Sequence, residues 1–400
     1  MVMIVRYMDR PAPFSLDPAI ALLGNEKEGM ALDFLTMRGY IRDRGTPANF
    51  FLGNLNELLE YQAPSIKFVM DSAGLLAPGT TLRCDHLADG TPLGVLSEES
   101  RTNVVLFNRD LGQTVWVAEN VIVARDQTGI DGAAGSASSV RALVDGGTVL
   151  QHITLARSAR FQTAWLKRLT GSGAVEMTMD GETWLPVSLT SDWTRVSIYP
   201  QTIENPSVGF RLATSGDRIA VEEGAFATSP IVTEDRPTVR TGDFFALATN
   251  RFPFNPDEGT FIVNYRPGPQ GGVGRQYMVA EIADPSDRQA GLLASAVRGS
   301  LAIECRSAGF AAEAVFTAPF ADHVFVNSGI AYRHNDSAGC FNGQTVQTDA
   351  SSLITLSRVT VLGVGAQSDG SGQTNGHIRS LVYIPRRISA AELRARTASA

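Results

Sequence analysis

The sequence predicts an all-β protein with two β-sandwich or jelly-roll domains in tandem behind an irregular N-terminal attachment region. Two observations favour this fold class. Glycine occurs 38 times in 400 residues, and Thr, Ser and Val are plentiful, as short strands joined by tight turns require. Many short segments also alternate apolar and polar residues, a pattern typical of strands with one buried face and one wet face.

The length indicates more than one domain, because 400 residues exceed what a single ordinary core holds. Hydrophobic residues make up 44% of the chain and charged residues 19%, which suits folded globular material. We therefore expect an N-terminal region over residues 1–103, a first sandwich over 104–235 and a second sandwich over 236–400.

The N-terminal region is rich in residues that interrupt regular structure. Pro11, Pro13, Pro18 and Gly24 surround a short apolar patch. Leucines at 55, 58 and 59 allow one short helix within residues 53–61. We expect extended strands and loops with little core of their own, stabilised by packing on something else.

The first sandwich is expected from short alternating runs between residues 104 and 235. Asp145-Gly-Gly147 and Asp180-Gly181 are hairpin signals between them. Strands at this spacing suggest a sandwich or jelly roll. The expected strands are 115–123, 148–155, 160–167, 174–179, 194–199 and 208–212.

The second sandwich follows a linker over residues 228–237. Asn342-Gly343 is a strong two-residue hairpin signal. Ser389 followed by Glu392 is a capping box, which predicts a short helix at the C-terminal end. The expected strands are 259–265, 276–282, 301–305, 324–326, 328–332, 359–363 and 376–384.

Charge and cysteine usage exclude several classes of protein. The net charge is −7 and no Lys/Arg run supplies a basic face, so nucleic-acid binding is not expected. No apolar stretch is long enough to span a membrane, so membrane insertion is not expected either. The three widely spaced cysteines, at 84, 305 and 340, argue against a disulfide framework or a zinc site and fit folding in a reducing cytoplasm.

An ordered series of motifs resembles a modular family of phage and prophage virion proteins. In that family "DSAG", "RFDH" and "GLLIEEARTN" occur in the same order in a connector, and "PRRLSxAEL" commonly ends the last domain. Cys84 replaces the usual aromatic residue and Ser97 the usual Ile. The corresponding segments here are Asp71–Leu76, Arg83–His86, Gly94–Asn103 and Pro385–Leu393.

Further segments extend the resemblance over roughly residues 70–397. Thr190–Val196 and Glu222–Pro230 are similar to the end of a carbohydrate-binding-module-like jelly roll. Phe254–Thr260, Asn375–Leu381 and Tyr383–Arg387 resemble a concanavalin A-like, or laminin-G-like, domain. The resemblance implies a virion surface or tail-associated protein with lectin-like modules. It fixes neither the position in the particle nor sugar binding.

No catalytic residues are predicted. A G-x-S-x-G nucleophile elbow is missing, and the five histidines (86, 152, 323, 334 and 377) are scattered. Metal-ligand spacings such as H-E-x-x-H are also missing, so neither a metal nor another cofactor is expected, although calcium through Asp336 or Asp369 stays open. Glu281 with Asp284 and Asp287 is the nearest approach to a glycosidase carboxylate pair, and Asp284–Asp287 is better explained as a turn.

Sugar binding has its own signature of aromatic faces beside Asn, Asp and Arg side chains. The candidates are Trp184, beside the Asp180-Gly181 turn, and Tyr332 with Asn335 and Asp336. Core or rim packing for Trp184 and a solvated strand end for the Tyr332 cluster are the competing interpretations. The other tryptophans, at 116, 165 and 193, fall on alternating strands and are expected to pack in the core.

Three functions remain open at this point. The first is a non-enzymatic virion surface protein (a fibre, spike or decoration component) that contacts host surface polysaccharide. Such a protein would be made in the bacterial cytoplasm, attach to other virion proteins through its N-terminal region and assemble as a homo-oligomer. The second is a polysaccharide depolymerase, and the third is a purely architectural decoration protein.

Overall fold

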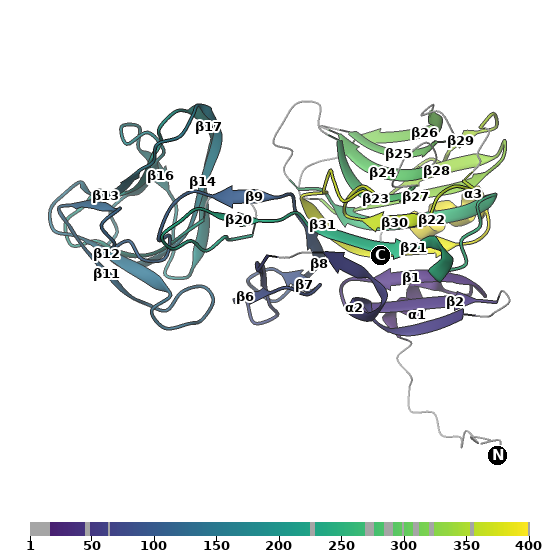
Figure 1. Ribbon diagram of the computed structural model, residues 1–400, viewed down its shortest axis with the longest axis horizontal. Helices are drawn as coiled ribbons and strands as arrows, with labels where there is room; N and C mark the ends of the chain where they lie inside the picture. Colours follow the sequence, from purple (N-terminus) through teal and green to yellow (C-terminus); the bar gives the residue numbers. More distant parts are fainter. Residues whose placement is uncertain are drawn as a thin grey trace, which may run out of the picture.

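The computed structural model confirms the all-β fold class. It describes residues 17–44, 49–62, 65–224, 229–268, 276–283, 291–297, 300–306, 312–319, 324–352 and 356–398. Figure 1 shows two β-sandwiches, joined by a narrow pair of strands. Among the described residues no helix is both long and apolar enough to span a membrane.

The larger sandwich, here called the terminal sandwich, is built from both ends of the chain. Its first sheet runs in the order β29 (Gln347–Asp349), β28 (Ser337–Phe341), β27 (Val326–Arg333), β22 (Glu258–Arg266), β31 (Gly376–Ile384), β1 (Gly29–Asp33), β2 (Arg38–Asp43) and β3 (Asn49–Asn54). At one end of β31, β8 (Pro92–Ser97) adds on and pairs in turn with β7 (Cys84–His86).

The second sheet of the terminal sandwich also includes an N-terminal strand. Its order is β26 (Ala312–Pro319), β25 (Ser300–Arg306), β24 (Gly291–Val297), β23 (Gln276–Ala283), β30 (Val361–Val364), β21 (Phe244–Ala248) and β4 (Glu60–Gln62). A 3₁₀ turn, η1 (Thr249–Arg251), follows β21. One continuous core lies between the two sheets, in which Met30, Leu32 and Ile41 from the N-terminal strands pack with Phe245, Phe261 and Tyr265.

The smaller sandwich, here called the inserted sandwich, comes from one continuous segment. One sheet runs β10 (Val117–Glu119), β13 (Gly147–His152), β18 (Ser207–Leu212), β15 (Val175–Thr178) and β16 (Leu185–Val187). The other runs β11 (Val121–Gln127), β12 (Ala137–Ala142), β19 (Arg218–Gly224), β14 (Ser158–Thr170) and β17 (Thr194–Ile203). The buried residues of its core all fall between Val105 and Val221.

The two sandwiches are joined by the two segments in which the chain leaves the terminal sandwich and later returns to it. Strand β9 (Arg101–Asn103) pairs antiparallel with β20 (Thr238–Arg240), so the outgoing and incoming segments lie side by side (Figure 1). A small hairpin, β5 (Lys67–Met70) with β6 (Leu76–Gly79), packs near Trp165 and Trp193 of the inserted sandwich. The inserted sandwich is therefore an insertion between strands of the terminal sandwich.

This topology corrects the expected N-terminal boundary. A break at residue 103 separates strands that belong to one sandwich, because β1 pairs with β31 and β4 pairs with β21. Residues 17–62 and 84–97 supply strands of the terminal sandwich and do not form a separate arm. Residues 1–16 lie outside the described residues.

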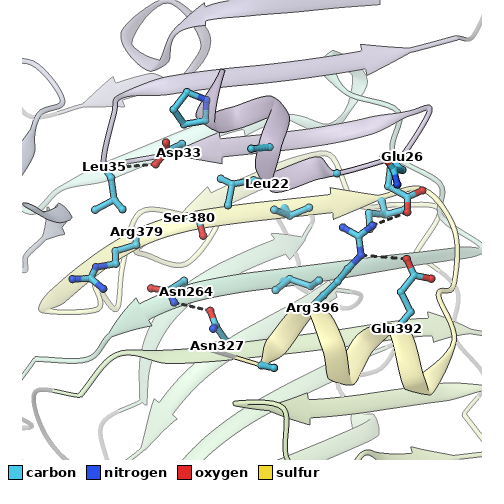
Figure 2. Close-up of a pocket in the computed structure, with 18 of the residues that line it drawn as sticks. Leu22, Glu26, Asp33, Leu35, Asn264, Asn327, Arg379, Ser380, Glu392 and Arg396 are labelled. Carbon is cyan, nitrogen blue, oxygen red and sulfur yellow. Dashed lines mark hydrogen bonds and ion pairs between the residues drawn. The ribbon is translucent and has the colours of Figure 1, made fainter. Parts of the chain in front are cut away.

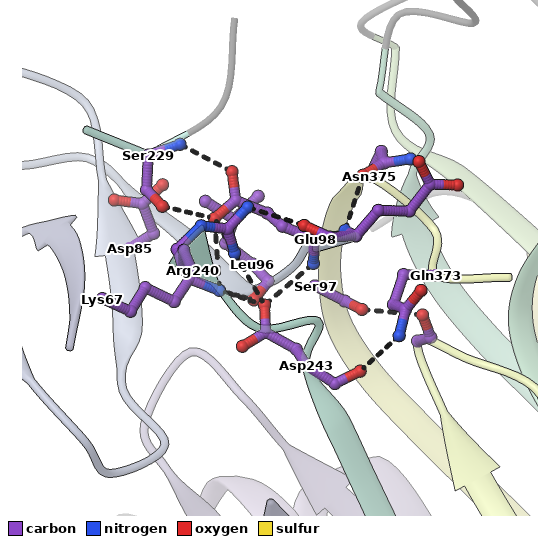
Figure 3. A network of polar contacts seen from close by, with 12 residues as sticks. Lys67, Asp85, Leu96, Ser97, Glu98, Ser229, Arg240, Asp243, Gln373 and Asn375 are labelled. Atoms are coloured by element: carbon purple, nitrogen blue, oxygen red, sulfur yellow. Dashed lines mark hydrogen bonds and ion pairs between the residues drawn. The ribbon is translucent and has the colours of Figure 1, made fainter. Parts of the chain in front are cut away.

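A buried ionic cluster fixes the junction (Figure 3). The Lys67 ammonium lies 2.5 Å from an Asp243 carboxylate oxygen and 3.6 Å from Glu98. An Arg240 guanidinium nitrogen lies 3.2 Å from Glu98. Ser229 donates to both Glu98 oxygens, from its backbone at 2.7 Å and its hydroxyl at 2.6 Å. The cluster thus connects four segments: β5, the residues directly after β8, the chain near Ser229 where it leaves the inserted sandwich, and the residues at the end of β20.

Several local predictions are confirmed. Helix α3 (Ala390–Thr397) begins after Ser389, whose hydroxyl accepts a hydrogen bond from the Glu392 amide at 3.1 Å. Asn342 and Gly343 both have positive φ, as a tight hairpin turn requires. All the strands expected between 148 and 212, and the 376–384 strand, are present.

Other predictions need correction. The expected strand 115–123 is divided into β10 and β11, because Asn120 has a φ of 59° between them. The expected helix over 53–61 is reduced to α2 (Leu55–Leu58), and a further helix, α1 (Pro18–Leu23), forms where only an apolar patch was noted. Strands β12 and β19 were not expected. Strand β12 is buried at five of its six positions and so shows no regular alternation.

Candidate functional site

A cleft of about 1490 Å³ lies on the outer face of the first sheet of the terminal sandwich, between helices α1 and α3 (Figure 2). Residues of β1, β31, β22 and β27 line its floor, and residues of α1 and α3 line its sides. The cleft therefore depends on both ends of the chain, since α1 and β1 come from the N-terminal region.

Strand alternation explains why the floor is exposed. Phe261, Val263 and Tyr265 of β22 point into the core, so Ile262 and Asn264 point outward. The two helices cover the apolar part of this outer face, where Leu23 of α1 and Leu393 of α3 are buried. The polar part between them stays open.

Four polar residues form one row across the floor, here called the polar row: Asp33, Ser380, Asn264 and Asn327. The pairing register places Asp33 opposite Ser380, Ser380 opposite Asn264, and Asn264 opposite Asn327. At the usual spacing of neighbouring strands the row extends about 14 Å. Such a row offers hydrogen-bonding groups along a line at right angles to the strands.

The amides in the polar row are only partly satisfied within the protein. Asn264 Nδ2 donates to Asn327 Oδ1 at 2.6 Å. Asn264 Oδ1 is buried without a hydrogen-bond partner among the described residues. Asp33, by contrast, accepts from the Leu35 amide at 3.0 Å and from the Thr36 hydroxyl at 2.6 Å, so its oxygens hold the turn after β1.

One end of the cleft is closed by an ion network. Arg386 lies 2.6 Å from Glu26 and 3.1 Å from Glu392. Arg396 lies 2.8 Å from Glu26 (Figure 2). Hydrogen bonding to the Glu26 carboxylate is the main reason that the pKa of Arg386 is raised. These charges compensate one another, so we assign this end a structural role.

The opposite end of the cleft carries arginine on an aromatic ring. The Arg379 guanidinium carbon lies 3.5 Å from the centroid of the Phe325 ring, and that of Arg266 lies 5.3 Å from the same centroid. Both Phe325 and Arg379 line the cleft. Arg379 sits beside Ser380 at an irregularity in the β22–β31 pairing, which places its side chain next to the polar row.

Trp184, the first sugar-binding candidate, lies in the inserted sandwich and outside this cleft. Its ring is half-buried, and the Arg211 guanidinium carbon lies 4.7 Å from the ring centroid. Arg211 in turn pairs with Glu176 at 2.5 Å. One face of the indole is therefore occupied by a cation of the protein itself.

In the cluster of Tyr332, Asn335 and Asp336, the structure leaves no aromatic face exposed to a sugar. Tyr332 is fully buried, and its hydroxyl donates to the Asn255 carbonyl at 2.7 Å. Asn335 holds a turn at a φ of 57°, and Asp336 is paired with Arg333 at 2.6 Å and Arg387 at 2.8 Å. The tyrosine ring is a core residue, because strand alternation turns it away from the solvent.

A buried Asp85–His377 pair was not predicted. His377 Nε2 lies 2.7 Å from Asp85 Oδ2, and Arg266 lies 3.1 Å from His377 Nδ1. Burial lowers the pKa of His377 despite the neighbouring carboxylate, so the ring is neutral and accepts from Arg266. The second ring nitrogen thus faces a guanidinium, where a catalytic dyad would have a hydroxyl or thiol.

Glu281, the nearest approach to a glycosidase carboxylate in the sequence, has a structural role, and Trp116 packs in the core as expected. Glu281 is buried and accepts from the Ser368 amide at 2.5 Å, while Asp284 and Asp287 lie outside the described residues. Trp116 is buried in the core of the inserted sandwich, with its indole N–H donating to the Leu106 carbonyl. Over the described ranges, His, Cys, Asp and Glu nowhere gather in a group of three that could hold a metal ion.

Comparison with known proteins gives partial structural similarity only. No family model matches the sequence, and no match was found among curated proteins. The CBM40 module of a Ruminococcus gnavus IT-sialidase is similar over 36% of this chain and 84% of its own, at 16% identity and a TM-score of 0.30. A leech intramolecular trans-sialidase is similar over 36% of this chain and 24% of its own, at 15% identity and a TM-score of 0.31. The binding domain of botulinum neurotoxin serotype D is similar over 39% of this chain and 40% of its own, at 9% identity and a TM-score of 0.31.

Proposed function

We propose that this protein is a non-enzymatic, glycan-binding surface protein and that the cleft between α1 and α3 is its binding site. The polar row carries this proposal. Asn264 and Asn327 present amide groups beside the Ser380 hydroxyl, and Asn264 Oδ1 lacks a partner among the described residues. Sugar hydroxyls both donate and accept, so they complement such a row, while Leu22 and Leu35 supply apolar contact.

The carboxylates around the cleft favour binding over hydrolysis. A glycosidase needs one carboxylic acid and one carboxylate free to face the sugar across about 5 to 10 Å. Here Glu26 and Glu392 are held by arginines, and both oxygens of Asp33 accept hydrogen bonds from its own turn. Among the acidic residues that the structure places in the cleft lining this leaves Glu28, and one carboxylate does not make the pair that hydrolysis requires. A depolymerase is therefore the weaker alternative.

We further propose that the protein belongs to a phage virion, as a fibre, spike or decoration component. The ordered connector motifs from Asp71 to Asn103 and the ending from Pro385 to Leu393 support this placement. On a particle many copies would engage one cell surface, so a weak single site would suffice for attachment. Assembly as a homo-oligomer on other virion proteins belongs to the same proposal.

Binding of the purified full chain to immobilised host surface polysaccharide tests the glycan-binding proposal. We expect saturable binding without release of reducing ends, and at least a tenfold loss on changing both Asn264→Ala and Asn327→Ala, about the effect of one or two hydrogen bonds. The matched control is Asn250→Ala, an exposed asparagine at η1. Release of reducing ends would favour a depolymerase. No binding, even in multivalent display, would favour a purely architectural protein.

A further inference from the structure

Two guanidinium groups beside Phe325 lack an acidic partner: Arg379, which lines the cleft, and Arg266, which lies on the same ring but is not a lining residue. Arg379 and Arg266 stack on Phe325, and neither is in an ion pair within the part of the chain that the structure describes. Arg379 Nη2 reaches only the Pro92 carbonyl, at 3.4 Å, and its Nε is buried without a partner. Arg386 and Arg396, at the other end of the same cleft, both pair with Glu26.

The surroundings leave this end of the cleft positively charged. Arg266 bonds to the neutral His377 ring, and Asp85, the carboxylate behind that ring, is occupied by His377 and the Met70 amide. Burial is the main cause that lowers the pKa of both arginines, and the charge of Arg379 lowers the pKa of Arg266 further, while the Asp85 carboxylate acts on Arg266 in the opposite direction. Two like charges held together and partly dehydrated are unfavourable unless an anion joins them.

We propose that Arg379, supported by Phe325 and Arg266, binds the carboxylate of an acidic sugar, so that the cleft selects carboxylate-bearing polysaccharides. This inference rests on the proposed glycan-binding function and names the substrate class. Arg379 follows His377 and Ile378 on β31 and lies directly before Ser380 of the polar row. A sugar whose hydroxyls contact Ser380 and Asn264 would therefore bring a carboxylate on the same ring to the guanidinium, which binds carboxylates through two parallel N–H groups.

The net charge of the chain means that an acidic polysaccharide can be attracted only at a particular site and not by the protein surface as a whole. At a net charge of −7 the protein as a whole repels polyanions. Binding of an acidic polysaccharide must then come from a site where positive charge is concentrated. Raising the salt concentration should weaken this binding, because part of its free energy comes from the carboxylate–guanidinium attraction.

The experiment compares acidic polysaccharides with their own neutral derivatives on the full chain. Polygalacturonate, hyaluronate and colominate are immobilised, each beside the same polymer after chemical reduction of its carboxylates to alcohols. We expect at least one acidic polymer to bind at least tenfold more tightly than its reduced form. Arg379→Gln should abolish that preference, Arg379→Lys should keep part of it, and Arg333→Gln, an exposed arginine at another end of the sheet, should change nothing.

Each other outcome is decisive. Equal binding of the acidic and reduced polymers, unaffected by Arg379→Gln, would overturn the carboxylate site and leave glycan binding intact. If dextran sulfate bound as tightly as the acidic polymers and its binding also depended on Arg379, the choice of carboxylate as the anion would be overturned. Failure of every polymer to bind, acidic or neutral, would overturn the proposed function together with this inference. Thermal unfolding of each variant identifies any loss that comes from misfolding.

Discussion

At the scale of single residues, the junction cluster has the largest energetic consequences. Lys67, Glu98, Arg240 and Asp243 are all at most 6% exposed, so each charge depends on the others for compensation. The two shortest ion pairs of the cluster, Lys67–Asp243 and Arg240–Glu98, join residues more than 100 positions apart in the sequence. No local pattern predicts such a cluster, because a single Glu or Arg in a connector looks like an ordinary surface charge.

Arg240→Met should destabilise the protein by about 3–5 kcal/mol, because Glu98 and Asp243 would stay buried with less compensation. Urea unfolding of the full chain measures the change in free energy. Arg218→Met is the matched control: it and its partner Asp126 are 34% and 42% exposed, so the loss should stay below about 1 kcal/mol. Equal effects of the two substitutions would mean that the junction does not depend on its ion pairs.

The same cluster predicts a pH dependence of stability. Burial alone would raise the pKa of Glu98, but Arg240 and Lys67 outweigh it and lower the pKa from 4.5 to about 2. A depressed folded-state pKa means that the contribution is fully present above pH 4.5 and is lost as the pH falls toward 2. The shift corresponds to about 3 kcal/mol.

Glu98→Gln tests this prediction, because glutamine has no carboxyl proton to bind. The free energy of unfolding of the unmodified chain, measured between pH 5 and pH 2.5, should fall more steeply than that of the variant. Parallel curves for the two proteins would show that Glu98 does not titrate in this range.

At the scale of elements, α3 shows how a local signal and a tertiary contact combine. The Ser389–Glu392 spacing predicted where the helix begins, but it did not predict which surface the helix covers. Gly329 of β27 allows the close approach: a Cβ there would lie 2.9 Å from Leu393 and 2.8 Å from Thr397. The helix therefore docks where the sheet has no side chain.

Leu393→Ala should cost about 2–5 kcal/mol, because Leu393 is fully buried between α3 and the sheet. The substitution should also weaken glycan binding, since α3 forms one side of the cleft. Chemical denaturation and polysaccharide binding measure the two effects. The control is Arg394→Ala on the exposed side of the same helix, which should change the free energy of unfolding by less than about 1 kcal/mol.

The polar row shows why the strands were more predictable than the site. Alternation in single segments predicted β22 and β31, and it would place Asn264 on one face of its strand. The row itself arises from pairing register between strands more than 50 residues apart, which alternation does not specify. Tyr332 shows the same limit, because a polar neighbourhood in sequence gave no information about its burial.

At the scale of the whole molecule, the insertion of one sandwich into the other determines which fragments of the chain contain every strand of a sandwich. The inserted sandwich draws all strands of its two sheets from residues 117–224. The terminal sandwich needs β1, β2, β3 and β4 from the N-terminal region, and β1 lies between β31 and β2 within its sheet. The resemblance in sequence covered both modules but gave no sign that the second one is completed by strands before residue 62.

A fragment of residues 104–235 should therefore fold alone, whereas a fragment of residues 236–400 should not. Without β1, the shorter fragment would leave the edge of β31 unpaired and expose the core surface that Met30, Leu32 and Ile41 cover. We expect 104–235 to unfold cooperatively in urea. Its tryptophan fluorescence should be red-shifted relative to that of the full chain, because Trp165 and Trp193 lose their contact with the β5–β6 hairpin. We expect 236–400 to aggregate, and to become soluble on co-expression with residues 17–97. A soluble 236–400 with a cooperative transition of its own would contradict the discontinuous sandwich.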